Sequence, residues 1–317
     1  MKKIVSFALL SILMAVPAMK AHAQEMEFTL TPRLEGTYNE ADRFGWGASA
    51  LYSFLEGQIN DKLSFYVTNH WLCDGTKYLY KNTKLASEND WLDAAALVYA
   101  PGDWEFKLGK DYLALGSFEM QYDDVDCYDP LMSVMWNTLP VYQWGGSILY
   151  NLNDEHAVNF ELASSPFQNH YFDEIFMTLG WNGTFGPLTN RWAASYDTSD
   201  IYMFTLGHRM DFSDRLYATL DFYNIVQDGA ADVYDVVAAA KYAFSDKFTL
   251  GGSFGNINGD HRYGGLSAEY KPLAGSGSFC EELRLHAFAS YNKVFTGDVD
   301  LPMVFGLGVT CPISFSK

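Results

Sequence analysis

Residues 113–140 carry the side chains with the clearest chemical potential in this chain, LALGSFEMQYDDVDCYDPLMSVMWNTLP. The residues of interest are Glu119, Tyr122, Asp123, Asp124, Asp126 and Asp129. Clustered carboxylates attract cations and raise their local concentration, and several oxygens at close spacing could bind Ca²⁺. The run DDVDCYD does not have the spacing of an EF-hand loop, so no cofactor is expected and Ca²⁺ is only a weak alternative. An acidic, solvated loop without a binding role explains the same residues equally well.

The flanking segments indicate what positions these carboxylates. WLDAAALVYA, the turn Pro101-Gly102 and DWEFKLGKDYL precede the acidic stretch, and VYQWGGSILYN follows it. Each flank alternates apolar with small or polar residues, as a β-strand with two different faces does. A long insert between two strands is uncommon and usually functional. If the strands form a membrane barrel, such an insert can fold into the lumen and narrow it.

The same alternation recurs along the chain and predicts sixteen strands. They cover residues 28–38, 44–54, 63–71, 91–99, 104–112, 142–150, 156–162, 174–183, 190–197, 201–211, 215–226, 232–243, 247–256, 262–271, 280–292 and 301–315. In 44–54 the pattern places Tyr52 and Phe54 on the apolar, lipid-facing side. An even number of strands with aromatic residues near their ends is typical of a transmembrane antiparallel up-and-down β-barrel. A soluble β-sandwich is the alternative, but the chain lacks its long apolar core runs.

The connections between these strands alternate in length. Every second link is a short turn, such as Asn60-Asp61-Lys62, Ser213-Asp214-Arg215 or Ser245-Asp246-Lys247, whose residue types favour tight turns. The longest inserts, 73–90 and 113–140, lie at the other ends of the strands. Short periplasmic turns and longer extracellular loops are the pattern of outer-membrane barrels. A longer Gly/Ser link at 272–279 is an exception on the short-turn rim.

The N-terminus predicts export. Residues 1–23 contain Lys2 and Lys3, an apolar run and the small-residue end Ala21-His22-Ala23, which is the pattern of a secretory signal peptide. The apolar run is too short to span a bilayer. We therefore expect residues 24–317 to form a single barrel domain in the outer membrane of a Gram-negative bacterium. The net charge of the whole chain is −18, which opposes binding to nucleic acid.

The strand face opposite the apolar side is predicted to line the lumen. Its charged residues are Arg33, Glu35, Asp93, Glu105, Lys107, Glu161, Arg191, Arg209, Asp221, Asp235, Lys241, Glu269, Glu282, Arg284 and His286. Lysine or arginine facing lipid costs about 2–4 kcal/mol at the midplane, so we assign these charged residues to the face that lines the lumen. A barrel of sixteen strands has room for a water channel. The alternative is a closed network of internal charges without transport.

Four cysteines permit disulfides in an exported protein. Cys280 and Cys311 are near opposite positions of the last predicted hairpin, one residue out of phase. Cys73 follows a strand on the loop side, and Cys127 lies in the acidic stretch. We predict the pairs Cys280 with Cys311 and Cys73 with Cys127. A metal site is not expected, because no paired-cysteine spacing occurs.

The chain shows no persuasive catalytic constellation. It has no His-Glu-x-x-His and no Gly-Lys-Ser/Thr motif. Its histidines are scattered. We therefore expect no enzymatic activity, with a barrel hydrolase as the remote alternative.

The stretch WLDAAALVYAPGDWEFKLGKDYLALGSFE resembles the porin O/P-like barrels of Bacteroidota and proteobacteria. The matching positions are Asp93-Ala94, Tyr99, Gly109-Lys110, Leu115-Gly116 and Glu119. The resemblance implies a barrel that passes small solutes. Some members of this family select anions through lumenal lysines, whereas this chain has few lysines and an acidic insert.

These observations together predict an outer-membrane porin for small hydrophilic solutes or ions, with a preference for cations. Its expected partners are outer-membrane lipid and the permeating solutes, and a homo-trimer is possible. The alternative is a closed barrel with a structural or partner-binding role.

Overall fold

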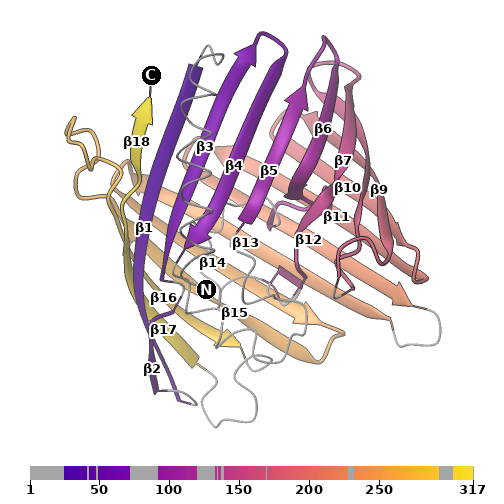
Figure 1. Ribbon diagram of the computed structural model, residues 1–317. Helices are drawn as coiled ribbons and strands as arrows, with labels where there is room; N and C mark the ends of the chain where they lie inside the picture. The colour runs from indigo at the N-terminus through magenta and orange to yellow at the C-terminus, as the bar shows by residue number, and fades with distance from the viewer. Residues whose placement is uncertain are drawn as a thin grey trace.

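In the computed structural model of this chain, the described residues form one antiparallel sheet that closes into a barrel (Figure 1). They are residues 25–40, 43–47, 49–71, 92–119, 133, 135–136, 139–168, 170–227, 232–292 and 303–316. The predicted signal peptide, residues 1–23, lies outside them. No helix within these ranges is long and apolar enough to cross a membrane.

The first half of the barrel runs from the first strand to the ninth. Its strands are β1 (Glu25–Asn39), β2 (Arg43–Gly45), β3 (Ala50–Asn60), β4 (Leu63–Trp71), β5 (Leu92–Tyr99), β6 (Trp104–Tyr112), β7 (Tyr142–Asn151), β8 (His156–Ser164) and β9 (Ile175–Phe185). β2 and β3 both pair with β1, and from β3 onward each strand pairs with the next in sequence.

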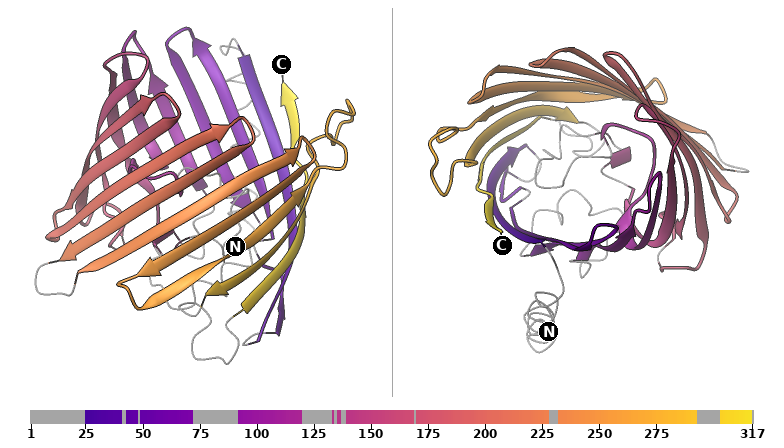
Figure 2. Two further views of the ribbon diagram at one scale, coloured as in Figure 1. Left: turned by 180° about the vertical axis from the view of Figure 1, so that it is seen from behind. Right: turned by 90° about the horizontal axis from the view of Figure 1, so that it is seen from above.

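The second half continues the meander and returns to the first strand. Its strands are β10 (Leu188–Asp197), β11 (Ile201–Ser213), β12 (Leu216–Gln227), β13 (Val233–Ser245), β14 (Phe248–Ile257), β15 (His261–Tyr270), β16 (Arg284–Asn292), β17 (Met303–Thr310) and β18 (Ile313–Ser316). Both β17 and β18 pair with β1, which closes the ring seen from above in Figure 2. Because β2 with β3 and β17 with β18 each form one interrupted strand, the described residues make sixteen barrel strands, as predicted.

The predicted strand 44–54 is interrupted, and this corrects its predicted faces. β1 pairs Thr37 with Gly45 and Arg33 with Ala50, so five steps on one strand oppose four on the other. One extra residue in a strand reverses which face the following side chains occupy. Phe44 therefore points outward, whereas Tyr52 and Phe54 line a cavity in the lumen. The prediction that these two aromatics face lipid is wrong.

The last hairpin also begins later than predicted. Residues 271–283 form a connection with internal turns, and β16 starts only at Arg284. Cys280 lies in one of these turns, where its carbonyl oxygen accepts the N–H of Leu283 at 2.9 Å. The thiols of Cys280 and Cys311 are free and joined by a hydrogen bond. The structure therefore lacks the predicted disulfide between them, and the predicted pair Cys73 with Cys127 lies outside the described residues.

The two rims differ as the sequence predicts. On one rim the turns are short, and an asparagine side chain caps two of them. Asn60 Oδ1 accepts the N–H groups of Lys62 and Leu63, and Asn153 Oδ1 accepts those of Glu155 and His156. The connection 271–283 is the long exception on this rim. Within it, Lys271 lies 2.9 Å from Glu282 and lowers the pKa of that carboxyl.

Apolar side chains cover the outer face. Leu108, Leu266 and Leu307 are each about 70 % exposed. Aromatic pairs lie outside near the short-turn rim, including Trp104 with Tyr150 at 4.5 Å between ring centres and Trp181 with Trp192 at 4.9 Å. An apolar band with an aromatic girdle at its edge is the surface that lipid requires.

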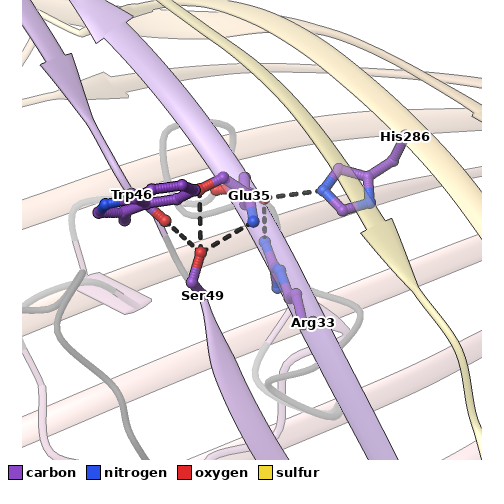
Figure 3. A network of polar contacts seen from close by, with 5 residues as sticks. All are labelled: Arg33, Glu35, Trp46, Ser49 and His286. Carbon is purple, nitrogen blue, oxygen red and sulfur yellow. Dashed lines mark hydrogen bonds and ion pairs between the residues drawn. The ribbon is translucent and has the colours of Figure 1, made fainter.

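The closure of the barrel carries a buried ionic network (Figure 3). Glu35 of β1 accepts from the Arg33 guanidinium at 2.6 Å and contacts Nε2 of His286 on β16 at 2.8 Å. Gly308 of β17 lies between the two strands, and a Cβ there would be 2.4 Å from the His286 ring. Its missing side chain lets His286 reach over β17. Ser49, in the interruption between β2 and β3, accepts the N–H of Glu35 at 2.8 Å. The network therefore joins the first strand to the last hairpin.

Replacement of Glu35 by alanine is expected to destabilise the barrel by about 3–5 kcal/mol, because Arg33 would remain buried without this carboxylate. Equilibrium unfolding by urea in lipid vesicles measures the change. Asp211→Ala is the matched control. Its pair with Arg209 is about 40 % exposed, and such a pair contributes less than about 1 kcal/mol. Equal effects of the two substitutions would contradict this role for the network.

Candidate functional site

The described parts of the connection between β6 and β7 lie inside the barrel. We call residues 113–141 the inner loop; the structure describes residues 113–119, 133, 135–136 and 139–141 of it. The first and last residues of the inner loop are hydrogen-bonded to each other, since the N–H of Leu113 donates to Val141 O at 2.9 Å. Ala114 then donates its N–H to Glu161 of β8 at 2.8 Å. The segment thus contacts the inner wall within two residues of leaving β6.

Asp221 of β12 holds the next part of the inner loop. Its Oδ1 accepts the N–H of Phe118 at 2.9 Å, and its Oδ2 accepts the N–H of Glu119 at 3.0 Å. Asp221 is buried. Both oxygens are directed at the loop backbone, whose N–H groups would otherwise lack partners there. Hydrogen bonds to a charged acceptor contribute about 1.5–3 kcal/mol each.

Glu119 links the earlier described part of the loop to its later part and to the wall. One carboxylate oxygen accepts the Tyr223 hydroxyl at 3.1 Å, and the other accepts the N–H of Ser133. Ser133 Oγ in turn accepts the N–H of Trp136 at 2.9 Å. Glu119 is buried by these contacts.

A third wall carboxylate holds the later part of the loop. Asp235 of β13 accepts the Tyr263 hydroxyl at 2.8 Å on both oxygens, and it accepts the backbone N–H of Met135. Tyr263 lies on β15, two strands away. It reaches Asp235 across Gly255 of β14, where a Cβ would be 2.1 Å from the tyrosine ring.

Two glycines let the loop lie directly on the wall. Gly116 has φ +70°, and a Cβ there would be 2.7 Å from the Ala193 nitrogen of β10. A Cβ on Gly207 of β11 would lie 2.9 Å from the Gly116 oxygen. The Arg191 guanidinium packs over the Phe118 ring, 4.7 Å from its centre. Backbone contact at this distance requires glycine on both sides.

Apolar packing adds to the polar contacts. The loop and the wall share one buried cluster formed by Leu113, Leu115, Met135, Trp136, Leu139, Val141, Ala163, Phe176, Met203, Tyr223, Val237 and Tyr263. Each fully buried large apolar side chain contributes about 1.5–3 kcal/mol. The inner loop therefore has its own core within the lumen, against the side of the barrel formed by β8–β15.

A cavity of about 520 Å³ remains beside the first residues of the loop. We call it the chamber. Among the described residues, its carboxylates are Glu56, Asp93, Glu105, Asp111 and Glu161, and its one basic side chain is Lys107. Its aromatic side chains include Tyr52, Phe54, Tyr66, Tyr112 and Tyr142. The chamber is thus acidic and lined with aromatic rings.

The predicted wall residues, with the exception of Glu282, lie on the inward face of the barrel. Asp93, Glu105, Lys107 and Glu161 line the chamber, and Asp221 and Asp235 hold the inner loop. The barrel register places the others on the same inward face: Arg33, Glu35, Arg191, Arg209, Lys241, Glu269, Arg284 and His286. Glu282 instead lies in the 271–283 connection. Their roles in permeation stay predictions.

Of the predicted constriction residues, Glu119 is described, and it faces the wall instead of open space. Tyr122, Asp123, Asp124, Asp126 and Asp129 lie outside the described residues, and so does the weakly predicted Ca²⁺ site. The sequence reasoning missed Glu56, Tyr52 and Phe54, because the interruption before β3 reverses their face. It also missed Gly207, although a glycine at an inward position signals a close neighbour.

The chain matches no protein-family model and no curated protein sequence. Its structure is similar to OmpT of Vibrio cholerae, with a TM-score of 0.57, 15 % identity, and coverage of 92 % of this chain and 97 % of that one. OpdK of Pseudomonas aeruginosa, solved with vanillate, gives a TM-score of 0.54 at 11 % identity over 92 % and 99 %. A porin refined at 1.8 Å gives 0.56 at 13 % identity over 92 % and 100 %.

Replacement of Asp221 by alanine is expected to release residues 113–119, because two backbone N–H groups lose their acceptor. Limited proteolysis of the folded protein in micelles should then cut within the inner loop at least about tenfold faster. Asp211→Ala, on the inner face of β11 and paired with Arg209, is the control and should not change cleavage. A loop that stays equally resistant in Asp221→Ala would exclude this anchor.

The described residues form a closed antiparallel barrel of sixteen strands, and the structure is similar to these solved structures over most of its length. This chain therefore has the fold of bacterial outer-membrane porins.

Proposed function

We propose that this chain is an outer-membrane porin through which small hydrophilic solutes and ions diffuse passively, with a preference for cations. The observation that carries the proposal is the chamber, which stays open beside an inner loop that is fixed to the wall. Outer-membrane lipid would surround the apolar belt, and no catalytic step is part of this function. We also propose the relation to porin O/P-like barrels suggested by the segment from Asp93 to Glu119.

The preference for cations follows from which charges are neutralised. Arg33 pairs with Glu35, Arg209 with Asp211 at 2.8 Å, and Arg284 lies 3.9 Å from Glu269. In the chamber, Asp111 pairs with Lys107 at 2.6 Å and Asp93 with His70. Glu56 and Glu105 have neither an ion pair nor a hydrogen bond within the described ranges. The wall therefore keeps uncompensated negative charge where solute would pass, which concentrates cations.

Oligomeric state is part of this proposal as well. One similar structure is a trimer form of OmpT from Vibrio cholerae. We propose the same state for this chain, and the mass of the protein–micelle complex by light scattering tests it.

Ion conductance in a planar bilayer under a salt gradient tests the function. Protein refolded without residues 1–23 should give discrete open steps with a reversal potential directed toward cations. The double variant Glu56→Gln with Glu105→Gln should shift that potential toward zero, because it removes both uncompensated carboxylates from the chamber. Asp246→Asn, in an exposed turn between β13 and β14, is the control and should leave the potential unchanged.

Further outcomes separate the alternatives. If the acidic stretch also lines the pore, the triple variant Asp123→Asn, Asp124→Asn and Asp126→Asn should reduce cation preference further. An anion-directed potential would refute the proposed selectivity while keeping the pore. Silence from correctly folded protein would refute the porin and favour a closed, partner-binding barrel.

A further inference from the structure

We propose that the chamber is a binding site for a small organic cation, an amine that also carries hydroxyl groups, such as an amino sugar. This inference deepens the proposed function, on which it rests for the route by which the ligand reaches the lumen. A volume of about 520 Å³ lies within the range of small-molecule sites.

The charges of the chamber select a cation. Three of its five carboxylates already have partners in the protein: Asp93 contacts His70, Asp111 contacts Lys107, and Glu161 accepts the N–H of Ala114. Glu56 and Glu105 are the two left for a ligand within the described chain. Lys107 offers little to an anion, because Asp111 neutralises it at 2.6 Å.

The protein's own lysine shows how the chamber accommodates an ammonium group. Lys107 Nζ lies 5.7 Å from the centre of the Tyr66 ring and 2.6 Å from Asp111 Oδ2. The Tyr66 hydroxyl also donates a hydrogen bond to Asp111. An aromatic face together with a carboxylate is the environment that stabilises an ammonium ion. Glu105, two residues before Lys107 on the same face of β6, offers a solute amine a second carboxylate beside Tyr66.

The remaining lining fits a hydroxylated body. Tyr52 and Phe54 have nearly parallel rings with centres 6.5 Å apart, and such a surface packs against the C–H face of a sugar ring. Asn159 Nδ2 is buried and has no hydrogen-bond partner among the described residues. Gly180 makes room for this amide, since a Cβ there would be 2.1 Å from Asn159 Oδ1. A buried donor without an acceptor costs free energy, which a ligand oxygen would offset once the Asn159 amide turns toward the chamber.

Calorimetric titration of the refolded protein in micelles at pH 6 tests the site with three sugars of similar size. Glucosamine carries a positive charge, N-acetylglucosamine none, and glucuronate a negative charge. We expect glucosamine to bind at least about tenfold more tightly than either of the others. Glu105→Gln and Glu56→Gln should each weaken its binding severalfold, whereas the rim control Asp246→Asn should not.

The outcomes distinguish this site from the pore. Equal affinity of wild-type protein for the three sugars would overturn the site, and this comparison needs no variant to fold. Unchanged glucosamine affinity in folded Glu105→Gln with Glu56→Gln would also overturn it. Selective binding by a protein that conducts no ions supports the site and refutes the porin. Conductance without selective binding keeps the porin and refutes the site.

Discussion

The structure depends on hydrogen bonds in which carboxylates of the barrel wall accept backbone N–H groups of the inner loop. A chain segment inside a barrel leaves the hydrogen-bond ladder, and every buried N–H group needs another partner. Asp221 supplies two acceptors, and Glu161 and Asp235 supply one each for loop N–H groups. Glycines at positions 116 and 207 bring the backbone close enough for these bonds. The position of the loop, and hence the shape of the chamber, follows from these few contacts.

Two groups of acidic residues in the lumen therefore have different tasks. Asp221, Asp235 and Glu119 are buried and hold the loop, so their charge is directed at protein groups. Glu56 and Glu105 line open space, and in the proposed function they determine the charge that a solute meets. A count of acidic residues alone would have assigned all of them to selectivity. The same reach across a glycine recurs at the barrel closure, where His286 passes Gly308 to contact Glu35.

The sequence predicts the barrel well because its alternation of faces is local information. Period-two patterning and the Asn or Ser turns locate the sixteen strands and distinguish the rims. The pattern fails at Tyr52 and Phe54, because one extra residue between β2 and β3 reverses the face without a change in composition. It also places Cys280 in a strand, although turns precede β16. The loop contacts are beyond such reasoning, since Phe118 and Asp221 are 103 residues apart in sequence.

Hydrogen–deuterium exchange on the refolded wild-type protein tests the central claim, that the wall carboxylates hold the loop by its backbone. The amides of Ala114, Phe118 and Glu119 donate to Glu161 and Asp221 inside the barrel. They are therefore predicted to exchange as slowly as amides of the neighbouring strands, even though residues 113–119 belong to no strand. Exchange of these amides at the rate of an unstructured peptide would contradict the account.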